Sequence, residues 1–125
     1  MENKDIEQYI IDLMQVQCQV KVFHWQTKIY GKHNALDGLF NAIIENIDEF
    51  TETAMGKYGR VDFSGVSYTF DNITDVGIAN LIDGFIDTAI ALDDKVDTKK
   101  DTDLLNLRDE LLGKLNQTKY LLTLK

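Results

Sequence analysis

The chain has 125 residues, of which 44% are hydrophobic, and it contains no proline. This length and composition suit one folded domain, residues 1–125, and exclude a disordered chain. The net charge of −8 argues against binding to nucleic acid, and a single cysteine, Cys18, excludes an intrachain disulfide. No apolar run approaches the ~20 residues of a membrane span, so the sequence predicts a cytoplasmic protein without membrane contact.

The first predicted helix runs from Asn3 to about Lys28. Its apolar residues recur at helical spacing and form one stripe: Ile6, Tyr9, Ile10, Leu13, Val16, Val20 and Phe23. A second stripe lies on a different face and consists of Ile11, Met14, Cys18, Val22 and Trp25. Because a surface helix needs only one apolar stripe, the second predicts a further contact, most simply with another subunit.

The second predicted helix follows Tyr30-Gly31, covers about Gly31 to Met55, and is ended by Gly56 and Gly59. Its apolar stripe consists of Leu36, Leu39, Phe40, Ile43, Ile47, Phe50 and Ala54. Residues 57–72 have no helical pattern and are long enough to cross the length of a helical bundle.

The third predicted helix starts near Ile73, and a polar turn at residues 97–101 separates it from the fourth. The apolar residues of the third are Ile78, Leu81, Ile82, Phe85, Ala89, Leu92 and Val96; those of the fourth are Leu104, Leu107, Leu111, Leu115 and Leu122. The sequence therefore predicts an all-α fold, a ferritin-like four-helix bundle with a long crossover between the second and third helices.

Ionisable residues recur along one side of the second predicted helix, at the edge of its apolar stripe. They are His33, Asp37, Asp48 and Glu52, and they fall within an arc of about 100°. The other histidine of the chain, His24, lies upstream in Phe-His-Trp-Gln. Imidazole and carboxylate ligands suit Fe²⁺, Zn²⁺ or Mn²⁺. The same residues also fit roles that involve no metal. The histidines would then be core or interface groups, and the carboxylates would form a solvated helix face.

These motifs resemble those of the Dps group of ferritin-like proteins, which oxidise and store iron. Phe23-His24-Trp25-Gln26 is similar to the His-Trp-Asn element that ends the first long helix of that family. Residues 33–40 are similar to its His-x-x-x-Asp element, and residues 47–52 to its Asp-x-x-x-Glu element. The resemblance spans nearly the whole chain. It departs from the family in Gln26, in a shorter turn between the first two helices, and in the lack of a basic tail.

The resemblance implies a metal site that two subunits share. His24, His33 and Asp37 would form one half-site, and Asp48 and Glu52 of a two-fold-related neighbour would form the other. It implies iron as the bound metal, with zinc or manganese as alternatives, and oxidation of Fe²⁺ for iron storage or protection from oxidative damage. It also implies a homo-oligomer, at least a dimer and in the family a dodecamer. Truncated Dps-like proteins of this kind resemble ones from phage genomes, which would place this protein in the host cytoplasm.

A non-enzymatic function is the alternative on the same scaffold, because a fold does not fix a function. The bundle would then bind a partner protein or a small ligand, or serve as a structural oligomer. The full set of ligand residues favours the ferroxidase hypothesis. The shortened turn and the missing tail favour the binding module, so the sequence does not decide whether the protein is an enzyme.

Overall fold

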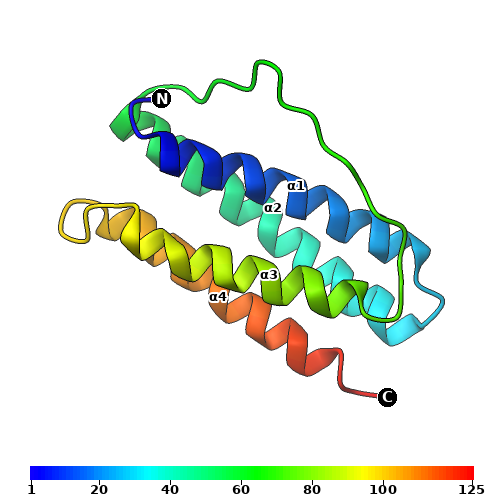
Figure 1. Cartoon of the computed structure of the whole chain (residues 1–125). Helices are drawn as coiled ribbons and strands as arrows, with labels where there is room; N and C mark the ends of the chain where they lie inside the picture. Colours follow the sequence, from blue (N-terminus) through cyan, green and yellow to red (C-terminus); the bar gives the residue numbers. More distant parts are fainter.

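The computed structural model describes residues 1–125, which form helices and no strands (Figure 1). The helices are α1 (Lys4–Gln26), α2 (Tyr30–Tyr58), α3 (Gly77–Ala91) and α4 (Thr102–Leu121), with a 3-10 turn, η1 (Leu92–Asp94), after α3. The predicted all-α class is confirmed. None of these helices has both the length and the apolar character that crossing a bilayer requires.

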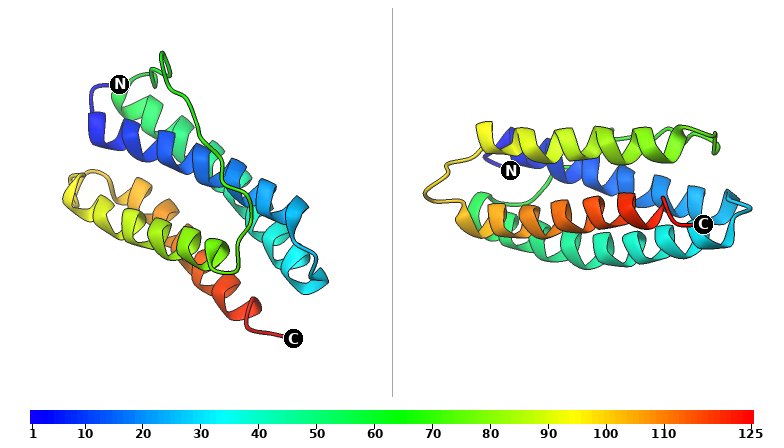
Figure 2. Two further views of the ribbon diagram at one scale, coloured as in Figure 1. Left: turned by 45° about the vertical axis from the view of Figure 1, so that its right-hand side comes forward. Right: turned by 90° about the horizontal axis from the view of Figure 1, so that it is seen from below.

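The helices are arranged as two antiparallel hairpins, α1–α2 and α3–α4. α1 packs against α2 and α3, and α4 packs against α2 and α3. The α1–α2 turn, the start of α3 and the end of α4 lie together at one end of the bundle, which we call the turn end (Figure 2). The N-terminus and the α3–α4 connection lie at the opposite end.

One apolar core runs between the four helices. The first predicted stripe of α1 and the predicted stripes of the other three helices contribute to it. Its largest fully buried side chains are Phe50, Ile6, Ile10, Leu13, Leu36, Leu39, Ile43, Ile82, Leu92, Leu104, Leu111 and Leu115. Burying each such side chain contributes roughly 1.5–3 kcal/mol. Two aromatic contacts, of Tyr9 with Phe50 and with Phe85, tie α1 to both of the helices that face it.

The ends of α1 and α2 follow local signals in the sequence. Asn3 caps α1, because its Oδ1 accepts hydrogen bonds from the backbone N–H groups of Asp5 and Ile6, each at 3.0 Å. Gly59 ends α2 with a φ of 89°, a conformation that glycine adopts without strain. Gly56, which we also expected at the end, lies inside the helix.

Residues 59–76 connect α2 to α3 without forming a helix, and they run back along α1 (Figure 1). Three glutamines of α1 hold this crossover by its backbone. Gln19 accepts from the N–H of Asp71 at 2.8 Å and donates to its carbonyl at 2.9 Å. Gln26 accepts from the N–H of Ile73, and Gln15 donates to the carbonyl of Thr69. The prediction that the third helix starts near Ile73 is wrong, because these contacts keep residues 71–73 out of the helix.

Candidate functional site

The two histidines lie side by side at the turn end, where α1 ends and α2 begins. Nδ1 of His24 is 2.8 Å from the carbonyl oxygen of His33, and Nδ1 of His33 is 2.9 Å from the carbonyl oxygen of His24. Because a carbonyl can only accept, both Nδ1 atoms carry the proton and donate it. The rings stack with their centroids 3.8 Å apart. In the neutral rings this leaves Nε2 as the nitrogen with a free lone pair.

Asp37 is the third predicted ligand at this place. Its Oδ1 lies 3.8 Å from Nε2 of His24 and 4.0 Å from Nζ of Lys21. The Lys21 ammonium also lies over the ring of Phe40, 4.4 Å from its centroid. Lys21 therefore offsets part of the charge of this carboxylate within the chain, and the sequence pattern did not reveal that contact.

The other two predicted ligands lie elsewhere on α2. Asp48 and Glu52 are exposed, and Asp48 is about 16 Å along the helix from Asp37 at 1.5 Å per residue. No three His, Cys, Asp or Glu side chains of the chain come close enough together to hold a metal ion. Within one chain His24 lies beside His33 and beside Asp37, but the three side chains do not form a metal-binding group. The shared site between two subunits stays a prediction.

The second apolar stripe of α1 is partly covered by the chain's own crossover. Ile11, Met14, Cys18 and Val22 are half-buried. The hydroxyl of Tyr68 donates to the carbonyl of Ile11 at 3.0 Å, and burial raises the pKa of Tyr68. The crossover therefore covers part of this stripe, and a second subunit would have to cover only the remaining part.

Large apolar side chains at the turn end are exposed to solvent. Trp25, Ile29 and Tyr30 are 69%, 55% and 78% exposed, and we call these three residues the turn-end patch. Lys28 lies between them in the chain, and Lys21 Nζ is 5.7 Å from the centroid of the Trp25 ring. Large apolar side chains that stay exposed within one short stretch of chain are typical of an interaction surface.

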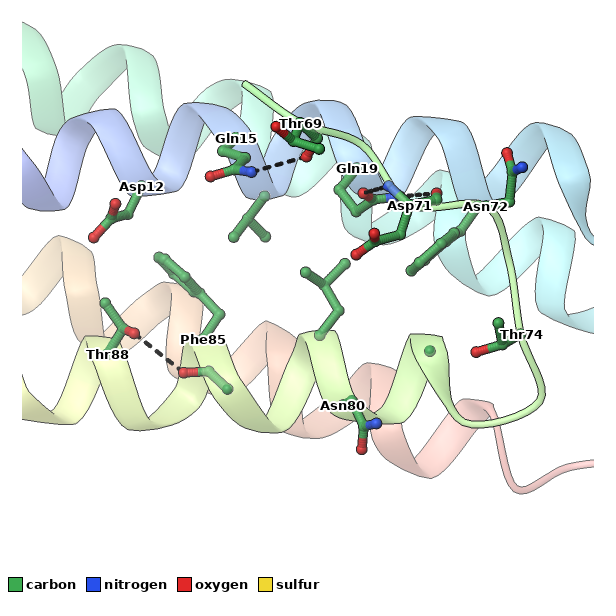
Figure 3. A pocket seen from close by; sticks show the side chains of 15 residues that line it. Asp12, Gln15, Gln19, Thr69, Asp71, Asn72, Thr74, Asn80, Phe85 and Thr88 are labelled. Carbon is green, nitrogen blue, oxygen red and sulfur yellow. Dashed lines mark hydrogen bonds between the residues drawn. The ribbon is translucent and has the colours of Figure 1, made fainter. Parts of the chain in front are cut away.

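A groove of about 640 Å³ runs between α1 and α3 and is bounded on one side by the crossover (Figure 3). Its base is apolar, with Val16, Phe23, Leu81 and Phe85. Its walls carry mostly amide and hydroxyl side chains, those of Gln15, Gln19, Thr69, Asn72, Thr74, Asn80 and Thr88. Our sequence interpretation missed this groove. The available signal was the spacing of Gln15, Gln19 and Gln26 on one side of α1, which marks the crossover's path.

The acidic residues of the α3–α4 connection hold the opposite end of the bundle together. The fully buried carboxylate of Asp101 accepts hydrogen bonds from the Tyr58 hydroxyl at 2.7 Å and from the Asp97 backbone N–H at 3.0 Å. Lys57 Nζ lies 3.3 Å from Asp101 and 2.9 Å from Asp103, and its hydrogen bond lowers the pKa of Asp103. These carboxylates therefore serve the fold, with no ligand required to explain them.

Comparisons with known proteins place the chain outside the Dps group. The family whose members match, over residues 24–122, is a family of unknown function, DUF5856. The chain is also 27% identical over 119 residues to an uncharacterized 14.6 kDa protein in the mobD-ri intergenic region of Enterobacteria phage T4. The aligned part covers 95% of this chain and 88% of the phage protein. No solved structure matches.

The identification as a Dps-like protein is thus wrong. It depended on short elements such as His-x-x-x-Asp and Asp-x-x-x-Glu, whose spacing of four residues arises on any polar helix face. The histidines also have a structural role here, since each fixes the backbone of the other across the α1–α2 turn. The chain belongs to the family of unknown function DUF5856.

Proposed function

We propose that this protein is a non-enzymatic helical binding module that docks on a partner protein through the turn-end patch. The observation that carries the proposal is the exposure of Trp25, Ile29 and Tyr30 on one short stretch of chain. Trp and Tyr are the side chains on which protein interfaces most often depend, and truncating such an anchor typically costs 2 kcal/mol or more.

The turn that carries the patch is fixed before any partner arrives. The reciprocal hydrogen bonds of His24 and His33 join the chain on both sides of Thr27, Lys28 and Ile29. Thr27 Oγ1 also accepts from the backbone N–H of Ile29 at 3.3 Å. A rigid turn loses little conformational freedom on binding, which favours affinity.

Site-specific photo-crosslinking in cells that express the gene tests this proposal. A photoreactive residue at position 29 should capture one protein reproducibly, whereas the same residue at Ile90, an exposed position on α3, should not. Trp25→Ala with Tyr30→Ala should reduce capture from position 29 at least tenfold. Equal capture from both positions, or capture that survives the double substitution, would overturn the proposal.

We further propose that the bundle has ferritin-like connectivity and works as a homodimer. The long crossover between α2 and α3 supports the first statement. Exposed Ile44 on α2 and the partly open stripe of Met14 and Cys18 on α1 support the second, since together they leave an apolar face on the α1–α2 hairpin. The similarity to a phage protein supports a place in the cytoplasm of an infected bacterium.

A second candidate function is the binding of iron, zinc or manganese between two copies of the chain. It is favoured by the two histidines, whose Nδ1–H groups are held by carbonyls in the manner of metal-binding imidazoles, and by Asp37 beside His24. Calorimetric titration with Zn²⁺ and with Fe²⁺ under argon should show saturable binding by the wild type. Asp48→Asn with Glu52→Gln should abolish it; unchanged binding would exclude the shared site.

A further inference from the structure

We propose that the groove between α1 and α3 binds an elongated dication of the diamine or polyamine class. This site is separate from the turn-end patch and does not depend on the function proposed for that patch.

The charged side chains that line the groove are all acidic. Asp12 of α1 and Asp71 of the crossover are the only ionisable groups among its 15 lining residues, and no Lys, Arg or His is present. No ion pair within the chain involves either carboxylate. An anionic ligand such as a phosphate would be repelled, whereas an ammonium group would be attracted at either position.

The two carboxylates are separated along the groove. Asp12 lies toward one end and Asp71 farther along, and both point toward the space between α1 and α3 (Figure 3). Asp71 is held at the level of Gln19 by two hydrogen bonds. The rise of an α-helix from residue 12 to residue 19 is about 10 Å. Two ammonium groups joined by a chain of methylenes match this spacing, while a single metal ion cannot contact both carboxylates.

The surface between the carboxylates suits a methylene chain. Val16 and Leu81 line the groove there, and the side-chain oxygens of Gln15 and Gln19 lie on its α1 wall (Figure 3). The volume of about 640 Å³ is in the range of small-molecule sites. Apolar carbons can bury the methylenes while the bordering oxygens accept hydrogen bonds from any inner ammonium group.

Gly84 keeps the middle of the groove open. It lines the groove from the interior of α3, and a Cβ built there would meet no atom within 4 Å. Packing therefore does not require glycine, although glycine inside a helix costs roughly 1 kcal/mol relative to alanine. A larger side chain at this position would extend from the wall of the groove, and its Cβ would meet no other atom.

Titration of the purified protein with putrescine and with spermidine, followed by amide NMR shifts, tests the proposal. Saturable shifts should appear for residues 12–19, 69–74 and 80–88, with n-butylamine and Mg²⁺ at matched ionic strength giving none. Asp12→Asn and Asp71→Asn should each weaken binding about fivefold, the effect of one partly exposed ion pair. Asp87→Asn, on α3 outside the groove, should leave it unchanged.

The glycine supplies a steric control that leaves the charges intact. Gly84→Met should abolish binding while the protein remains as stable as the wild type or becomes more stable. Gly113→Met is the matched variant, because Gly113 also lies inside a helix with nothing within 4 Å of a built Cβ but outside the groove. Binding by Gly84→Met, equal effects of the two glycine variants, equal binding of Mg²⁺, or no saturable shifts would each overturn the proposal.

Discussion

The imidazoles of His24 and His33 hold each other's backbone, with Nδ1–carbonyl distances of 2.8 and 2.9 Å and a ring separation of 3.8 Å. This pair closes the connection between α1 and α2 at the point where both helices lose their regular hydrogen bonds. The carbonyl of His24, in the last turn of α1, thereby finds a donor. The pairing explains two histidines in one place without any metal.

Replacing His33 by phenylalanine should keep the stacked ring but remove its donor. The carbonyl of His24 then loses its partner, so the free energy of unfolding should fall by about 1–2 kcal/mol. Urea unfolding followed by circular dichroism measures this change. Asn34→Ala, at an exposed neighbouring position, is the control, and an unchanged midpoint for His33→Phe would show that the pair does not stabilise the turn.

Gln19→Leu should release the crossover while the four helices persist. Both hydrogen bonds to the Asp71 backbone would be lost, and the buried leucine offers no replacement. Amide hydrogen exchange at residues 69–73 should accelerate at least tenfold, as expected for a loss of about 1–3 kcal/mol. The exposed Gln117→Leu serves for comparison. Faster exchange throughout the core would mean that the crossover and the helices unfold as one unit.

The sequence was informative where apolar spacing determines structure. The stripes that begin at Ile6, Leu36, Ile78 and Leu104 all face the core, because burial of apolar surface dominates their placement. The start of α3 was predicted too early, since the Gln26–Ile73 contact joins residues far apart in the chain. Local pattern contains no information on such a contact.

At the candidate site, too, spacing along one helix was predictable, whereas contacts between helices were not. Helical spacing placed His33, Asp37, Asp48 and Glu52 on the same side of α2 but did not bring them to the same height. It could not show that Asp37 lies beside His24, because His24 belongs to another helix. The pattern also could not reveal Lys21, whose ammonium approaches Asp37 from another helix. Residues that share a helix face are therefore weaker evidence for a site than residues that different elements bring together.

Stability should fall as the pH drops below about 4, and Asp97 should contribute to that fall. Hydrogen bonds from the backbone N–H groups of Lys99 and Lys100 lower the pKa of the Asp97 carboxyl in the folded state. The Asp97 carboxyl therefore binds a proton more readily in the unfolded chain. Its carboxylate stabilises the fold at pH values above the pKa of the unfolded state, and this stabilisation is lost as the pH falls through the lower pKa of the folded state. Thermal midpoints of Asp97→Asn between pH 3 and 6 should depend less steeply on pH than those of wild type. Parallel curves would contradict this role.

Val22→Glu should dissociate the proposed homodimer. Val22 lies half-buried in the second stripe of α1, so a charge there would be desolvated in an interface formed by that face. Multi-angle light scattering at micromolar concentration should give a dimer for wild type and a monomer for the variant. Glu110→Gln, on the exposed surface of α4 and away from the α1–α2 hairpin, is the control, and a monomeric wild type would remove the dimer altogether.

Charge is distributed unevenly along the bundle that carries the turn-end patch. Residues 13–36 and 111–125 contain six lysines and no Asp or Glu, so all 21 acidic side chains lie in the remainder of the chain. The protein therefore has an electric dipole directed roughly along its long axis, despite a net charge of −8. In the field of an acidic surface such a molecule turns its lysine-bearing end forward before contact. The rate at which it meets such a surface would then depend on salt more strongly than the lifetime of the complex does.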